Sequence, residues 1–121
     1  MKIENEKLKL SAMDESLKKC MSVSVYKIGV YTFDVDTRQL ILKKISVKLA
    51  QKETYLLVYL AAKINSIVPR TELLSRIWGE VTVKNSRSMD VYICKLRKLL
   101  SEDPKISIIC YNKIGCRLNV R

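Results

Sequence analysis

Apolar and polar side chains alternate along the first half of the chain, once a polar N-terminal stretch has passed. Within 26–30 and 33–35 every second residue is apolar, which is typical of strands with one buried face. Residues 36–38 (Asp-Thr-Arg) have the composition of a turn. Further short strands are predicted over 39–43 and 45–48. The pattern therefore predicts an antiparallel meander of three or four strands.

A helical period of 3.6 residues replaces this alternation at Ala50. Residues 50–64 carry a wide apolar stripe and are predicted to form a well-buried helix. Val68 is expected to be extended because it precedes a proline. Pro69 is suited to the first turn of a second helix over 70–78, which Gly79 is expected to end.

A third helix is predicted from a cap at Asn85 or Ser86 to about Leu100. Strand-like alternation then returns in 106–111 and 115–120, which predicts a β-hairpin. A small sheet, three helices and a hairpin in this order describe an α+β fold, the winged helix-turn-helix. We assign residues 23–121 to this domain and residues 1–22 to a linker or a partly ordered N-terminal segment.

The third helix has two different faces when it is drawn with 100° per residue. One face is apolar and is expected to lie in the core: Met89, Ile93, Leu96 and Leu100, flanked by Tyr92 and Leu99. The opposite face holds three cations and no acidic residue: Arg87, Val91, Cys94, Lys95 and Lys98. A helix of this kind fits the major groove of DNA, where cations donate to guanine and valine contacts the thymine methyl group. The alternative is a cationic face that only faces water.

Two charged residues flank that face. Arg97 lies at the side of the helix, which suits a contact with a phosphate. Asp90 also lies at the side, and we expect it to orient Arg87 or another nearby basic residue rather than to contact DNA.

The net charge supports a polyanionic partner. The chain has 23 basic and 12 acidic residues, a formal charge of +11. Residues 84–121 contain nine basic and three acidic residues and so carry over half of this excess. A basic surface concentrated in one segment is the expected footprint of contacts with phosphates.

The residue types present argue against an enzyme and against a metal site. Histidine is absent, which excludes histidine-ligated metals and a histidine general base. No glycine-rich phosphate loop or paired carboxylates are found, so we expect no enzyme, cofactor or metal. No long apolar run or signal peptide is present, so a cytoplasmic protein without membrane contact is expected. The four cysteines are expected to be free thiols, although Cys110 and Cys116 can face each other across the hairpin.

Residues 26–120 resemble the DNA-binding effector domain of OmpR/PhoB-type response regulators. Four stretches carry the resemblance: KETYLL at 52–57, VPRTELL at 68–74 with IWG at 77–79, NSRSMDVYICKLRKLL at 85–100, and GCRL at 115–118. The third stretch is the most specific, with Asp-Val and Leu-Arg-Lys at fixed spacing. The resemblance implies sequence-specific binding of duplex DNA and regulation of transcription, with the third helix as the recognition helix.

The resemblance also implies roles for single residues. Base contacts are expected from Lys95, with Val91, Cys94 and Lys98 on the same face. Phosphate contacts are expected from Arg70, Trp78, Arg87, Ser88, Tyr92 and Arg97. The loop 79–84 matches a loop that can touch RNA polymerase. Family members bind tandem direct repeats, which implies self-association on DNA.

The hairpin departs from the family pattern in two places. Asn112 stands where an arginine usually enters the minor groove, and Cys116 stands where an aromatic residue usually follows the glycine. Lys113 and Arg117 remain as the cations of the wing, and Lys113 would supply the charge at its turn. Family members normally carry a phosphorylatable receiver domain ahead of this domain. Residues 1–25 cannot supply one, so the chain is either an excised effector domain behind a linker or a stand-alone member. The resemblance favours the first.

A second hypothesis stays open beside DNA binding. The winged helix can serve as a protein-interaction module with little DNA specificity, and the atypical hairpin agrees with that use. Weak and non-selective affinity for DNA would distinguish it.

Overall fold

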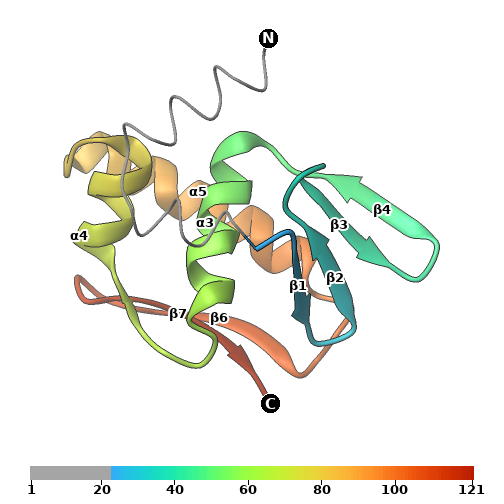
Figure 1. Cartoon of the computed structure of the whole chain (residues 1–121). Coiled ribbons are helices and arrows are strands. Elements are labelled where there is room, and N and C mark those ends of the chain that lie inside the picture. The colour runs from blue at the N-terminus through green and yellow to red at the C-terminus, as the bar shows by residue number, and fades with distance from the viewer. Residues whose placement is uncertain (1–22) are drawn as a thin grey trace, which may run out of the picture.

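Two antiparallel sheets and three consecutive helices make up the computed structural model, which describes residues 23–121 (Figure 1). The predicted linker over 1–22 lies outside the described residues. The first sheet contains strands β1 (Val25–Ile28), β2 (Tyr31–Asp34), β3 (Gln39–Leu42) and β4 (Ile45–Lys48), paired in sequence order. The predicted meander is therefore confirmed.

The pleat of this sheet directs alternate side chains into the core. Tyr26 pairs with Phe33, and Phe33 pairs with Leu40 on the same face. Phe33 and Leu40 are buried, whereas Thr32, on the opposite face, is only partly covered. The period of two in the sequence thus predicted which face packs on the helices.

The three helices follow the predicted order. Helix α3 spans Gln51–Ala62 and is buried over nine of its residues. Helix α4 (Arg70–Leu73) continues directly into a π-helical turn, η1 (Leu74–Trp78), where the sequence predicted one regular helix. Gly79 ends it in the left-handed region, at φ +88°. Helix α5 spans Val83–Leu99.

The predicted cap of the third helix was wrong. Helix α5 begins earlier than expected, and its N-cap is Thr82, whose hydroxyl accepts the backbone N–H of Asn85 at 3.0 Å. Thr82 is extended, at φ −129° and ψ 162°, so it turns the chain into the helix. Asn85 and Ser86 then lie within the first turn.

The second sheet has the order β5 (Val68–Pro69), β7 (Gly115–Val120), β6 (Ile106–Tyr111). Strands β6 and β7 form the predicted hairpin, called the wing below. The expectation of free thiols was wrong for two cysteines, because Cys110 and Cys116 form a disulfide. The wing register places them directly opposite each other, with Cα atoms 4.1 Å apart.

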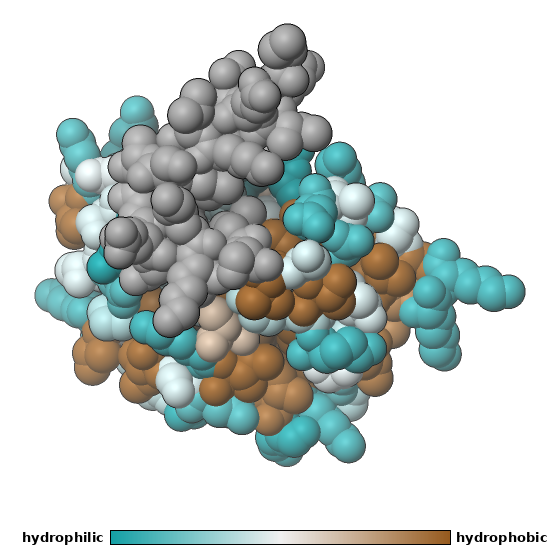
Figure 2. All heavy atoms as spheres, in the orientation of Figure 1, coloured by the Kyte–Doolittle hydropathy of each residue, from teal (hydrophilic) through white to brown (hydrophobic). Residues whose placement is uncertain are grey.

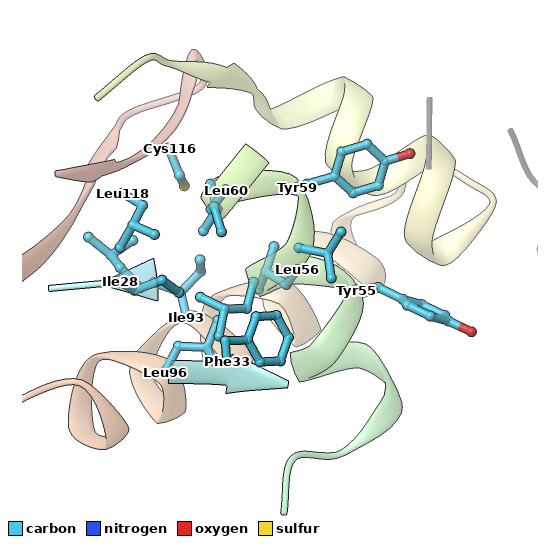
Figure 3. Close-up of a cluster of buried hydrophobic side chains, with 14 of the residues drawn as sticks. Ile28, Phe33, Tyr55, Leu56, Tyr59, Leu60, Ile93, Leu96, Cys116 and Leu118 are labelled. Atoms are coloured by element: carbon cyan, nitrogen blue, oxygen red, sulfur yellow. The ribbon is translucent and has the colours of Figure 1, made fainter. Parts of the chain in front are cut away.

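One apolar core joins both sheets to the helices (Figure 3). Phe33, Leu56, Leu60, Ile93, Leu96 and Leu118 converge there from β2, α3, α5 and β7. Hydrophilic and hydrophobic side chains share the described surface on the side drawn in Figure 2. The core fixes helix α5 between α3 and the wing, and this decides which side of α5 faces outward.

Candidate nucleic-acid interface

Helix α5 is anchored by its apolar stripe. Met89, Ile93 and Leu96 are at most 2% exposed. The five residues on the opposite side are all exposed: Arg87, Val91, Cys94, Lys95 and Lys98. We call these five the exposed face of α5. The exposure that the helical wheel predicted is therefore confirmed, and three cations project from a rigid helix.

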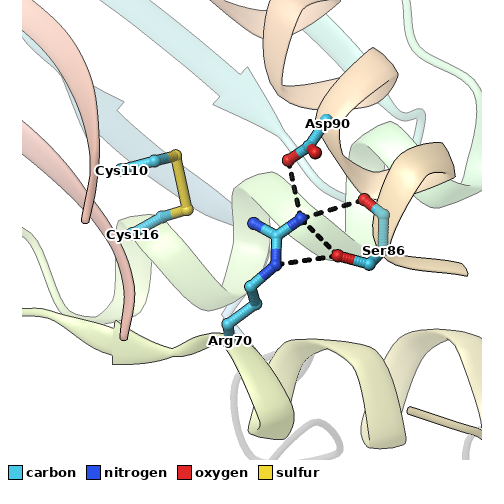
Figure 4. A network of polar contacts seen from close by, with 5 residues as sticks. All are labelled: Arg70, Ser86, Asp90, Cys110 and Cys116. Atoms are coloured by element: carbon cyan, nitrogen blue, oxygen red, sulfur yellow. Dashed lines mark hydrogen bonds and ion pairs between the residues drawn. A yellow bond between two sulfur atoms is a disulfide. The ribbon is translucent and has the colours of Figure 1, made fainter. Parts of the chain in front are cut away.

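An arginine from the preceding helix fixes the first half of α5 (Figure 4). The Arg70 guanidinium donates to the Ser86 hydroxyl at 2.7 Å and to the Ser86 carbonyl oxygen at 2.9 Å. It also forms an ion pair with Asp90 at 2.7 Å. Asp90 thus pairs with Arg70, 20 residues away in sequence, and not with Arg87, which the sequence had suggested first. The Arg70 side chain is only 16% exposed, so its guanidinium mainly contacts groups of the protein.

A row of two cations and two aromatic rings links α3, η1 and α5. The ring centroids of Trp78 and Tyr92 lie 6.0 Å apart. Lys52 lies 5.3 Å from the Trp78 ring and donates to the Ile77 carbonyl oxygen, while Lys95 lies 5.1 Å from the Tyr92 ring. Cation–π contacts of this kind hold a cation in place over a ring. Tyr92 therefore positions Lys95. The participation of Lys52 in this row was not predicted from the sequence.

Arg97 connects the end of α5 to the wing. Its Nε and Nη2 atoms both donate to the Ile108 carbonyl oxygen, at 3.0 and 2.9 Å. Strand β6 is an edge strand, so this contact occupies a carbonyl that no neighbouring strand reaches. The side chain remains exposed at the flank of the helix. Ser88, which is also predicted to hold a phosphate, is half-buried.

The wing presents its turn to solvent. Asn112, Lys113 and Ile114 are exposed, and Lys113 lies in the left-handed region at φ +61°. Arg117 is half-buried, with its guanidinium 5.7 Å from the centre of the Tyr111 ring. Lys113 is thus the cation at the tip of the wing, whereas Arg117 lies on its flank.

The loop between η1 and α5 and the first residue of α5 expose apolar side chains that the sequence did not single out. Val81 is 55% exposed and Val83 is 69% exposed. The side-chain amide of Asn85 donates to the Glu80 carbonyl oxygen and shapes the loop. Along residues 23–121 no helix has the length and apolarity needed to span a bilayer. The same residues contain no cluster of three cysteine or acidic side chains that would hold a metal ion.

The sequence matches a known protein family over residues 44–118, and that family is described as "Transcriptional regulatory protein, C terminal". The transcriptional regulatory protein RprY of Bacteroides fragilis is 44% identical over 101 residues, which are 84% of this chain and 43% of that protein. The chain spans less than half the length of RprY and of other curated relatives that it matches.

Solved structures agree with the fold. The DNA-binding domain of RstA from Klebsiella pneumoniae, determined in complex with the RstA box, superposes with a TM-score of 0.66 at 28% identity. That match covers 80% of this chain and 98% of the RstA domain. The response regulator DrrB of Thermotoga maritima, an OmpR/PhoB homologue, gives a TM-score of 0.66 at 26% identity. It covers 79% of this chain and 44% of DrrB.

Proposed function

Since the chain belongs to the family of C-terminal domains of transcriptional regulatory proteins, the OmpR/PhoB type, we propose that it binds duplex DNA sequence-specifically and regulates transcription. The observation that carries the proposal is the exposed face of α5, held outward by a fully buried stripe. An α-helix of this form enters the major groove, where side chains reach the edges of base pairs.

We assign the DNA contacts as follows. Lys95 reads base edges from the middle of α5, with Val91, Cys94 and Lys98 beside it. Arg87, at the start of the exposed face, neutralises a phosphate. Trp78 and Tyr92 donate to phosphates through the indole N–H and the phenol hydroxyl, and Ser88 does so through its hydroxyl.

Arg70 and Arg97 have two roles in this proposal: each holds the protein together and each contacts a phosphate. Each guanidinium is already bound to protein acceptors, so each reaches a phosphate while remaining tied to Ser86 or Ile108. Such a contact is pre-organised, because the side chain has lost its freedom before DNA arrives. In the wing, Lys113 approaches the DNA backbone from the exposed turn, between Asn112 and the flanking Arg117.

The partners beyond DNA follow from the same family. We place a receiver domain ahead of this chain in the whole protein, and we expect two copies to associate on direct repeats. The exposed Val81 and Val83 provide apolar contacts for RNA polymerase in the loop 79–84. The domain acts by binding and not by catalysis, and the cytoplasm is where its DNA and polymerase lie.

Selection of genomic DNA fragments by the purified chain tests the proposal. We expect enrichment of a direct repeat whose half-sites are spaced by about one helical turn. Affinity for the enriched duplex should fall steeply with salt, since each phosphate contact releases counterions. Failure to enrich any fragment, with weak and equal affinity for all duplexes, would favour the protein-interaction module instead.

A further inference from the structure

The disulfide of the wing lies at a place that DNA binding does not explain. Cys110 and Cys116 are the second facing pair from the turn, next to the pair Tyr111 and Gly115. Facing residues without mutual backbone hydrogen bonds approach each other most closely in an antiparallel ladder. The Cα separation of 4.1 Å shows that the pair occupies such a position, where two sulfur atoms meet.

The two cysteines differ in exposure. Cys116 is 0% exposed and belongs to the apolar core, whereas Cys110 is half-buried. A thiol arriving from solvent therefore meets the Cys110 sulfur first. Accessibility of this kind decides which sulfur of a disulfide is attacked.

The pair is connected to the recognition helix by a short route (Figure 4). Cys116 pairs with Val68, and the Arg70 N–H donates to the Ile114 carbonyl oxygen at 2.9 Å. The guanidinium of the same Arg70 binds Ser86 and Asp90 on α5. One residue thus joins the turn of the wing to the first half of the helix.

We propose that Cys110 and Cys116 form a thiol–disulfide modification site whose oxidation state sets the affinity of this domain for DNA. The inference rests on the proposed function. The reductant is a small or protein dithiol, and the oxidant is a disulfide of the same class. In a reducing compartment Cys110 and Cys116 remain thiols until such an oxidant reacts with them.

The exchange proceeds in two balanced steps. A thiolate of the dithiol attacks the Cys110 Sγ, the bond between the two cysteines breaks, and the electron pair stays on the Cys116 Sγ, which takes a proton. The second thiolate of the reductant then attacks the first sulfur of the reductant, which is bonded to the Cys110 Sγ in the mixed disulfide. The Cys110 Sγ leaves and takes a proton. The protein gains two electrons and two protons, and the dithiol becomes a disulfide.

Opening the bond changes the wing because two thiols need more room than two bonded sulfur atoms. The core holds Cys116, so the displacement falls on Cys110 and on the turn that follows it. That movement weakens the hydrogen bond from the Arg70 N–H to the Ile114 carbonyl oxygen. The hydrogen bonds from the Arg70 guanidinium to Ser86 then weaken as well. The oxidised form is therefore the better pre-organised one, and we expect it to bind DNA about three- to tenfold tighter than the reduced form.

The test compares the full chain with its Cys110→Ala variant, which keeps Cys20 and Cys94 but cannot close the bond. Both are equilibrated in reduced or oxidised dithiothreitol, and alkylation followed by peptide mass measurement reports the state of each cysteine. Fluorescence anisotropy then gives the affinity for the duplex enriched from genomic DNA and for a random duplex. Amide hydrogen exchange at Arg70 is measured without DNA.

The inference predicts that oxidation tightens binding and slows exchange at Arg70 in the natural chain, and changes neither in the variant. Equal affinity and equal exchange in the two forms would overturn it, and so would an equal response of the variant. If neither form binds any duplex while the Arg70 amide still responds to oxidation, the proposed function fails and the coupling between wing and helix stands.

Discussion

Replacing Arg70 by methionine should destabilise the domain. A residue that only contacts a phosphate would have no such effect, so this variant distinguishes the two roles. The substitution keeps an unbranched apolar stem and removes the guanidinium. Hydrogen bonds made by a charged group contribute about 1.5–3 kcal/mol, and the contacts with Ser86 at 2.7 and 2.9 Å are of this kind. The ion pair adds little, because the Asp90 side chain is 62% exposed and such pairs give about 0–1 kcal/mol.

We therefore expect Arg70→Met to lower the free energy of unfolding by about 2 kcal/mol. Asp90→Asn should lower it by less than about 1 kcal/mol. Urea denaturation followed by Trp78 fluorescence measures both, since the chain has one tryptophan and it packs against Tyr92 on α5. Arg87→Met is the matched control. That side chain is exposed on the same helix, so its loss should weaken DNA binding and leave stability within about 0.5 kcal/mol.

Two results would contradict a stabilising role of the contacts between Arg70 and Ser86. If Arg70→Met left stability unchanged, the contacts with Ser86 would contribute nothing and Arg70 would act on DNA alone. If Asp90→Asn cost as much as Arg70→Met, the exposed ion pair and not the contacts with Ser86 would hold the helix.

Three further predictions concern the elements that place the interface. Thr82→Ala removes the cap of α5 and should cost about 1 kcal/mol in urea denaturation; a loss no larger than that from replacing the exposed Thr71 would show that Thr82 does not cap. Gly115→Ala introduces a Cβ that collides with the Val68 carbonyl oxygen, so we expect a loss of about 1–3 kcal/mol, and an unchanged midpoint would contradict the close pairing of β5 with β7. Burial raises the pKa of Tyr31 above its ordinary value of 10.0, outweighing the N–H that Glu102 donates to its hydroxyl. Because the unfolded chain then loses this proton first, stability should fall as the pH rises above about 10, and Tyr31→Phe should make that fall shallower; equal alkaline slopes would show that Tyr31 does not cause it.

Local patterns predicted most of the secondary structure. The wing strands agree with the alternation in 106–111 and 115–120 because a period of two is set by the backbone itself. The apolar stripe of α5 agrees with the helical wheel for the same reason. The cap at Thr82 was missed because Asn85 and Ser86 have equally good capping side chains, and only the path of the loop decides among them.

Contacts between distant residues could not be predicted in the same way. Arg70 is far from Asp90 in sequence, and only the packing of α4 on α5 makes them partners. The contact of Arg97 with Ile108 depends on β6 being an edge strand. The disulfide depends on the register of the wing, which places Cys110 directly opposite Cys116 and not one residue away. Sequence spacing allowed that register but did not require it.

The most direct test of the account is the base preference of the Lys95→Ala variant. The affinities of the natural chain and the variant are measured for every single-base-pair change of the enriched duplex, with Lys27→Ala on the N-terminal sheet as control. We predict that Lys95→Ala flattens the preference at one or two adjacent base pairs, at a cost of about 1–3 kcal/mol, and that Lys27→Ala leaves the profile unchanged. An unchanged profile for Lys95→Ala would contradict the assignment of base reading to the exposed face of α5.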